Sequence, residues 1–236
     1  MRLRRGQAAV ETALTMPLLV FMILGAIQLF MLMQARILAQ YAASRAVRAG
    51  AQNFGDCFTM YDTAHLVLLP AIDSGFAKAP SRGTRYADEV RLRMQSNRYV
   101  PSEDDGRDGP VVWMDRLEPL VGSVRADEEE TWDLPPHRFL DVRMVFWAPL
   151  KIPFANWVFV RMAMAHFGLR ELHTADPIMP VKRDANWVRY SSGPRAELAT
   201  ELVRRFDLKQ YVFPIQVTYA TRMMSPVRFT EQNCPR

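Results

Sequence analysis

Histidine is the side chain most often used for acid–base chemistry and zinc binding near neutral pH, and the chain has four. They are His65, His137, His166 and His173. None stands in the His-Glu-x-x-His spacing of a zinc hydrolase, and no Gly-x-Ser-x-Gly, P-loop or Gly-x-Gly-x-x-Gly pattern occurs. His166 and His173 could share a helical face, but two ligands alone make a poor metal site. We therefore expect no catalytic residue, no cofactor and no metal.

Carboxylates gather at residues 104–109, Asp-Asp-Gly-Arg-Asp-Gly, with Asp115 further along. Oxygen ligands around glycine turns are typical of calcium loops. An EF-hand register beginning at Asp104 would place Gly106 at the third position and Asp115 where a glutamate is usual. The pattern therefore favours a solvated acidic loop.

Charge elsewhere indicates a membrane topology signal and no nucleic-acid partner. The net charge of +5 comes from 30 basic and 25 acidic residues that are interleaved, and 49% of the residues are hydrophobic, as in a globular protein. Arg2, Arg4 and Arg5 lie directly before a long apolar run, where basic residues hold the amino end in the cytoplasm.

The apolar run from Thr12 to Ala35 has 24 residues without a charge, which as a helix reach roughly 36 Å, enough to cross a lipid bilayer. A buried helix of a soluble protein would normally be shorter and show a polar face, and the apolar region of a secretory signal is only about 7–15 residues long. We predict one membrane-spanning helix that continues as an alanine-rich stalk ending near Gly50, with the residues after Arg36 outside the cytoplasm.

Two residues of this helix stand out: Glu11 for its charge beside an apolar run, and Pro17 for its effect on the backbone. Glu11 would cost a few kcal/mol if it moved toward the bilayer centre, so it either stays at the interface, where the helix dipole favours it, or pairs with a cation. Pro17 removes a backbone hydrogen bond inside the run and would kink the helix or loosen its preceding turn.

Taken together, residues 4–11 (Arg-Arg-Gly-Gln-Ala-Ala-Val-Glu), Met16-Pro17-Leu18-Leu19 and the apolar run resemble the N-terminus of TadE-like proteins. These are pilin-like subunits of the tight adherence (Tad) pilus machinery, and the likeness is strongest over residues 4–50. In this family a prepilin peptidase cuts after a glycine that follows basic residues, so the resemblance implies cleavage between Gly6 and Gln7. It also implies that Glu11, of the same or a neighbouring subunit, neutralises the new amino group of Gln7 and sets the register of assembly.

The remaining residues predict a mixed domain. Alternation predicts strands at His137–Leu150 and Tyr211–Arg222, and Pro214 makes the second an edge or bulged strand. Charged and apolar spacing predicts a helix at Tyr86–Arg98. Residues 154–169 are strongly apolar but short for a second span, and a core helix is favoured over a partner-binding or membrane-surface helix.

The predicted fold class is therefore α+β, with a long N-terminal transmembrane helix continuing as a stalk, followed by a compact mixed periplasmic domain. Its segments are a basic leader at 1–6, the transmembrane and stalk helix at 7–50, and the exported domain at 51–236, with loops around 101–110 and 176–194.

Two cysteines stand at opposite ends of the predicted exported domain. In an oxidising envelope compartment Cys57 and Cys234 favour a disulfide that closes the domain on itself, against the alternative of two unpaired thiols.

Two functional hypotheses follow. In the first, the chain is a pilin-like subunit of a Tad pilus, held by one span in the bacterial inner membrane, with its domain in the periplasm or in a surface pilus. Its partners would be the lipid bilayer, other pilin-like subunits, the Tad assembly platform and the prepilin peptidase. In the second, it is a permanently tethered envelope binding or sensor domain that keeps its leader.

Overall fold

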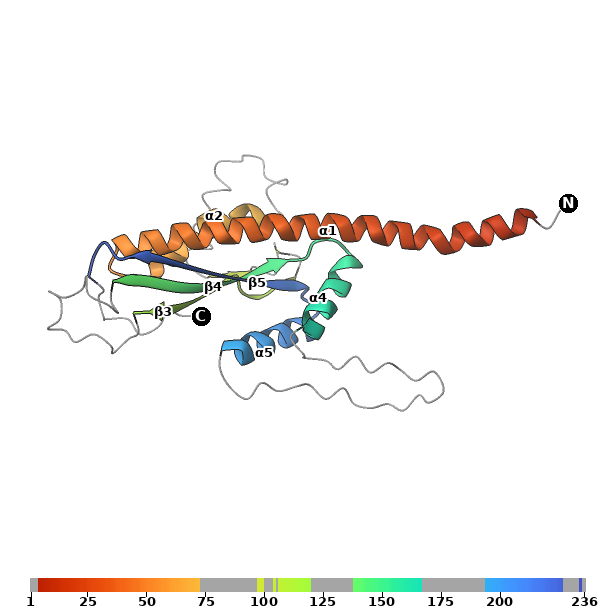
Figure 1. The fold of residues 1–236 in the computed structure, drawn as a ribbon. Helices are drawn as coiled ribbons and strands as arrows, with labels where there is room; N and C mark the ends of the chain where they lie inside the picture. The colour runs from red at the N-terminus through yellow and green to blue at the C-terminus, as the bar shows by residue number, and fades with distance from the viewer. Residues whose placement is uncertain are drawn as a thin grey trace, which may run out of the picture. The chain divides into compact units, whose positions relative to one another are not determined.

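The computed structural model describes residues 4–72, 97–99, 104, 106–119, 138–166, 194–226 and 234. The chain forms two compact units, residues 1–33 with 150–213 and residues 34–149 with 214–236. Helix α1 (Arg4–Gln52) contributes to both (Figure 1). A long apolar helix followed by a mixed helix and sheet region confirms the predicted α+β class. Because the two units cut across the predicted segments 1–6, 7–50 and 51–236, those segments stay a prediction.

Helix α1 is built mostly from strong helix formers and ends two residues beyond the predicted Gly50. Its end is set by Phe54 and Gly55, which have φ angles of 57° and 76°. The Gly55 amide donates to the carbonyl of Gly50 at 2.8 Å, which closes the last turn. The amide of the preceding residue, Phe54, donates to the Oγ of Ser225 at 2.9 Å.

The sheet of the second unit has the strand order β3 (Val112–Glu118), β4 (Phe139–Pro149), β5 (Val212–Arg222), as Figure 1 shows. Strands β4 and β5 confirm the two predicted strands, and β5 is an edge strand, as Pro214 predicted. β3 pairs antiparallel with β4, with Val112 opposite Phe146 and a register shift between Arg116 and Glu118.

A second, two-stranded sheet joins β1 (Arg98–Tyr99) to β2 (Gly109–Pro110). The helix predicted for Tyr86–Arg98 lies mostly outside the described residues, and at its last two residues the prediction is wrong. Asn97 has a φ of 46°, and its side chain both donates to the Val112 carbonyl (2.8 Å) and accepts from the Val112 amide (3.2 Å). These bonds draw the chain into a strand because they fasten it to the start of β3. β2 likewise occupies part of the loop predicted around 101–110.

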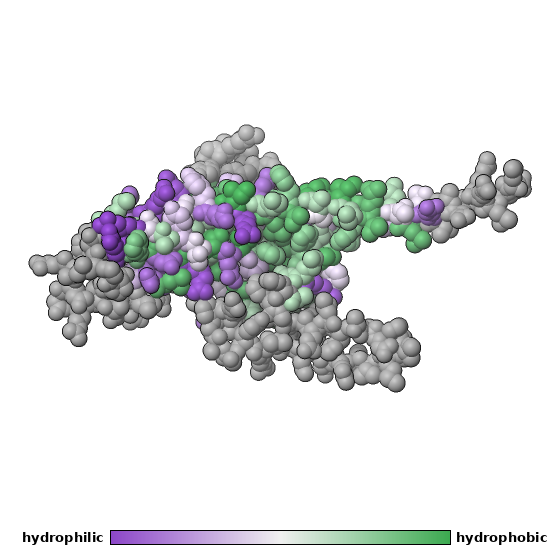
Figure 2. All heavy atoms as spheres, in the orientation of Figure 1, coloured by the Kyte–Doolittle hydropathy of each residue, from purple (hydrophilic) through white to green (hydrophobic). Residues whose placement is uncertain are grey.

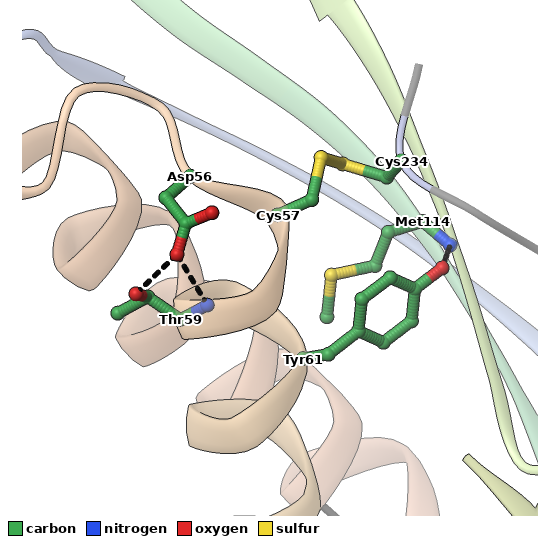
Figure 3. The surroundings of a disulfide bond; sticks show 6 residues. All are labelled: Asp56, Cys57, Thr59, Tyr61, Met114 and Cys234. Atoms are coloured by element: carbon green, nitrogen blue, oxygen red, sulfur yellow. Dashed lines mark hydrogen bonds between the residues drawn. A yellow bond between two sulfur atoms is a disulfide. The ribbon is translucent and has the colours of Figure 1, made fainter. Parts of the chain in front are cut away.

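Helix α2 (Cys57–Ile72) packs against β3 and β4. The Tyr61 hydroxyl accepts a hydrogen bond from the Met114 amide at 3.1 Å, so the helix also satisfies a backbone donor of β3 (Figure 3). Trp113 and Trp147 meet edge to face at 5.0 Å between ring centroids. Large side chains that are fully buried in this unit are Met60, Leu68, Leu69, Ile72, Tyr99, Met114, Leu140, Met144, Phe146 and Trp147.

Figure 3 shows how the start of α2 is held. Asp56 precedes the helix and accepts a hydrogen bond at Oδ2 from the Thr59 amide at 2.9 Å, an N-cap that satisfies one free donor of the first turn. The next residue, Cys57, forms a disulfide with Cys234 across 177 positions of sequence, and both cysteines are buried.

The first unit contains α4 (Ala155–His166) and α5 (Pro194–Asp207), which pack on each other. The buried faces carry Val160, Ala163, Met164, Leu198, Ala199 and Leu202. On α5 the Glu201 carboxylate accepts hydrogen bonds from Arg204 and from the fully buried Arg205, each at 2.7 Å. Burial alone would raise the pKa of Glu201, but the two guanidinium groups outweigh it and lower that pKa.

Candidate membrane and assembly interface

The N-terminal half of α1 is an apolar surface. Every residue from Glu11 to Ile23 is exposed, and Figure 2 shows the hydrophobic side chains gathered along this part of the helix. The large exposed apolar side chains of this segment are Leu14, Met16, Leu18, Leu19, Val20, Phe21, Met22, Ile23, Ile27, Leu29, Phe30 and Met33. A surface of this kind is stable in lipid or against other apolar helices. Among the described residues α1 is the one helix long and apolar enough to cross a membrane.

Two polar side chains of this part of α1, Thr15 and Gln28, form hydrogen bonds with backbone groups. The Thr15 hydroxyl donates to the carbonyl of Glu11 at 2.9 Å, one turn earlier on the same helix. Gln28 is fully buried, whereas Ile27 and Leu29 on either side of it in sequence are exposed. Its Oε1 accepts a hydrogen bond from the Ile152 amide at 2.9 Å, so the segment that leads into α4 lies against α1 at this level.

The predicted processing site lies in the first turns of α1. The backbones of Gly6 and Gln7 are helical, and Gln7 precedes Glu11 by one helical turn, a rise of about 6 Å. The side chain of Glu11 is exposed. An amino group created at Gln7 would therefore stand close to the Glu11 carboxylate of its own chain, and the same carboxylate is open to a neighbouring chain.

Pro17 also lies inside α1, on its exposed surface. Because proline has no N–H, the carbonyl of Ala13 loses the donor that it would have in a regular helix. The helix nevertheless continues without interruption through this position. Pro17 is thus accommodated within α1 with one backbone hydrogen bond fewer than in a regular helix.

The C-terminal half of α1 presents a different surface. Its buried positions are mostly alanines, Ala35, Ala39, Ala42, Ala43, Ala46 and Ala51, which let the helix approach its neighbours closely. The approach is tightest at Gly50, where a Cβ atom would lie 2.6 Å from the Sδ of Met60 and 3.1 Å from a Cδ of Leu140. The opposite side still exposes Ile37 and Tyr41. One side of this segment therefore packs within its own unit, and the other side is exposed.

Sequence reasoning missed Gln28 and Gly50 as structural residues. Gln28 drew attention only as an interruption of the apolar run, and the bond that it makes reaches a residue 124 positions away. Gly50 suggested the end of the stalk, because a glycine after a helix is a common terminator. The signal that could have corrected this is the second glycine, Gly55, which takes the positive φ.

Two of the residues that the sequence raised as possible site residues, His65 and Asp104, are buried in the fold. His65 is buried on α2 with Nε2 2.9 Å from Oδ1 of Asn97, while His137 and His173 lie outside the described residues. Asp104 is buried, and its carbonyl accepts bonds from the amide and the guanidinium of Arg107. Within the described part of the chain no three His, Cys, Asp or Glu side chains gather as metal ligands would.

Comparison with known proteins identifies the N-terminal segment. A family model described as TadE-like protein matches residues 6–48, a segment that begins at Gly6 and contains the whole apolar surface of α1. No curated protein and no solved structure matches the chain. The match confirms the resemblance to TadE-like proteins of the Tad pilus. Residues 6–48 are thus similar to TadE-like proteins, and they contain most of a helix that is long and apolar enough to span a membrane.

Proposed function

We propose that this TadE-like chain is a pilin-like structural or assembly subunit of a Tad pilus, held in the bacterial inner membrane by α1 and assembling through the same helix. The observation that supports this most directly is an overlap of two segments. The family match covers residues 6–48, and the exposed apolar side chains of α1 from Leu14 to Met33 all lie within it. An apolar helix that is not covered by its own chain can exchange lipid for the helices of other subunits with little change in its surroundings.

In this proposal the prepilin peptidase removes residues 1–6, and Gln7 becomes the mature N-terminus. The new ammonium group then lies about 6 Å along the helix from Glu11. In a low-dielectric setting the pair attracts strongly, either within one chain or between a new subunit and the one already in place. Only one axial position brings a neighbour's ammonium to Glu11, and the pair would therefore set the register of assembly.

The proposed topology places the amino end in the cytoplasm and the residues after the membrane span in the periplasm. Arg2, Arg4 and Arg5 support this orientation because short basic flanks stay on the cytoplasmic side. The Cys57–Cys234 disulfide supports it as well, since disulfides persist in oxidising compartments. The proposal assigns no catalytic step to this chain, and its partners are other pilus subunits, the assembly platform, the peptidase and lipid.

The decisive experiment is to determine the mature N-terminus by intact-mass and terminal-peptide analysis of protein from native membranes, with and without the prepilin peptidase. We expect a start at Gln7 that requires the peptidase. As a control, a Gly6→Leu variant should keep its leader in both strains, because a bulky side chain then replaces the small residue that the peptidase needs before the cut. A leader retained by the unaltered chain in both strains would contradict processing and leave a permanently tethered envelope domain.

A further inference from the structure

Helix α4 shows an apolar outer face that its position in a folded unit does not explain. Away from its buried face the helix carries Trp157, Val158, Arg161, Met162 and Ala165, which follow the i, i+1, i+4, i+5, i+8 spacing of one helical stripe, and Phe154 directly precedes the helix. Phe154, Trp157 and Met162 are 76%, 43% and 62% exposed. A helix on the surface of a soluble unit should present polar residues on this side.

Helix α5 of the same unit shows the usual arrangement. It buries Leu198, Ala199 and Leu202, and turns Glu197, Thr200 and Arg204 outward. The two helices pack on each other and share one set of surroundings, so the difference between their outer faces is specific to α4. Water suits the outer face of α5, and a less polar medium suits that of α4.

The position of α4 along α1 identifies this medium. Gln28 follows Glu11 by 17 residues, a rise of about 26 Å along the helix, while the hydrocarbon core of a bilayer is about 30 Å thick. With Glu11 at one face of the membrane, Gln28 stands close to the other face. The hydrogen bond from the Ile152 amide to Gln28 holds the turn before α4 at this level, three residues from the start of the helix.

The residue types on the outer face suit a membrane–water interface. The Arg161 guanidinium lies over the Trp157 ring at 4.2 Å, which pairs an aromatic ring with a cation that can reach lipid phosphate. Tryptophan, tyrosine and long basic side chains are typical anchors at this depth. Phe154 has a φ of 64°, a conformation that bulky residues rarely adopt, and it is the most exposed aromatic side chain of the described residues of this unit.

We propose that α4 is an interfacial helix, whose Trp157 and Met162, with Phe154 directly before it, insert into the lipid bilayer crossed by α1, on the side of the membrane where the span ends. Lipid is what contacts the outer face of α4. This inference rests on the proposed function, in which α1 spans the membrane. The role of α4 is to set the height of the subunit in the membrane before assembly. Helices of this kind lie in the plane of the interface with the apolar face about 5–10 Å deep.

Spin labels on three variants of the full chain, each with one added cysteine beside the intact Cys57–Cys234 disulfide, test the proposal in nanodiscs of phosphatidylethanolamine and phosphatidylglycerol. Met162→Cys reports α4, Leu18→Cys reports the middle of the span, and Tyr41→Cys lies about 20 Å beyond Gln28 on the same helix. The three replaced side chains are matched in exposure at 62%, 63% and 54%. The measured quantity is collision with oxygen, which partitions into lipid, against collision with a water-soluble nickel chelate.

We expect the oxygen-to-nickel ratio at position 162 to be several-fold above that at 41 and below that at 18. A ratio at 162 equal to that at 41, with 18 still deep, would place α4 in water and overturn the inference while the span of α1 stands. Exclusion of both reagents at 162 would show a protein cover and overturn the choice of lipid. Access of nickel to position 18 would show that the span itself is wrong, and the proposed function would fail with it.

Quenching by brominated lipids gives a second readout that needs no label. Replacing Trp157 with Phe keeps the face apolar, so it should remove most of the tryptophan emission that these lipids quench. Trp113→Phe is the matched control, because Trp113 packs on Trp147 in the other unit. Equal quenching of the wild-type chain and the Trp157→Phe variant would overturn the inference.

Discussion

At the scale of the residue, Gly50 and Gly25 lie on the same helix in opposite surroundings. A Cβ at Gly50 would meet Met60 at 2.6 Å, whereas nothing lies within 4 Å of one at Gly25. Met60 is fully buried and cannot simply move aside. We expect Gly50→Ala to lower the free energy of unfolding by about 1–2 kcal/mol, since overpacking outweighs the better helix propensity of alanine.

Gly25→Ala is the matched control and should change the free energy of unfolding by no more than about 1 kcal/mol. Both variants can be compared by thermal unfolding of the full chain in detergent, followed by circular dichroism. If both alanines leave the midpoint unchanged, the contact between α1 and α2 at Gly50 is looser than the structure has it.

Glu11 can be tested separately from membrane insertion. Removing its charge leaves the apolar surface of α1 intact, so Glu11→Ala should insert normally but reduce pilus output several-fold if the carboxylate pairs with the amino group of a neighbour. Glu11→Asp keeps the charge and should retain more output than alanine. Membrane fractionation measures insertion, and sheared surface protein measures pili. Wild-type output from Glu11→Ala would argue against a role in register.

At the scale of the element, α5 contains a pH-dependent brace. Two arginines hold the pKa of Glu201 below its ordinary value of 4.5, so its contribution to stability is complete above that pH and is lost as the pH falls through the lowered pKa. Glu201→Gln removes a charged partner from the fully buried Arg205 and should destabilise the chain by about 1–3 kcal/mol near neutral pH.

The thermal midpoints of wild type and Glu201→Gln should therefore converge as the pH is lowered below 4.5. Asp207→Asn provides a control, because Asp207 is an exposed carboxylate at the end of the same helix. A difference between wild type and Glu201→Gln that stays constant down to the lowest pH would mean that the charge of Glu201 is not what stabilises α5.

The elements differ in how far the sequence predicts them. α1, β4 and β5 follow from local pattern, since an uncharged run and strict alternation each have one simple structural solution. Helices α2 and α5 were missed although Asp56 caps the first and Pro194 begins the second, because each is a weak local signal inside a mixed region. β3 depends on pairing with residues about 30 positions later, which no local pattern contains.

The predicted core helix at residues 154–169 shows the same limit within one element. The structure has α4 over Ala155–His166, with one face buried as predicted and the other exposed. Sequence left three surroundings open for this stretch, because a helix that is apolar on every side has no polar face to orient it. Gln28 resolves part of the question, and its bond to Ile152 could not be read from either segment alone.

At the scale of the whole molecule, the Cys57–Cys234 disulfide closes a loop with a sequence separation of 177. In the chain-entropy model a loop of this length stabilises the folded state by about 5 kcal/mol. We expect the Cys57→Ser/Cys234→Ser double variant to unfold at a markedly lower guanidinium concentration in detergent. Wild type treated with a thiol reductant should match the double variant, and each single variant should match it too. Coincident transitions of the double variant and the oxidised wild type would refute the contribution.

The disulfide also determines the covalent path that a mechanical force takes when a subunit is pulled. Cys57 follows the end of α1 by five residues, and Cys234 is two residues from the last residue, Arg236. A tensile force applied between the end of α1 and Cys234 therefore has a covalent path through the sulfur–sulfur bond that bypasses residues 58–233. The bond limits how far these two points of the chain can be drawn apart, even if the contacts between them break.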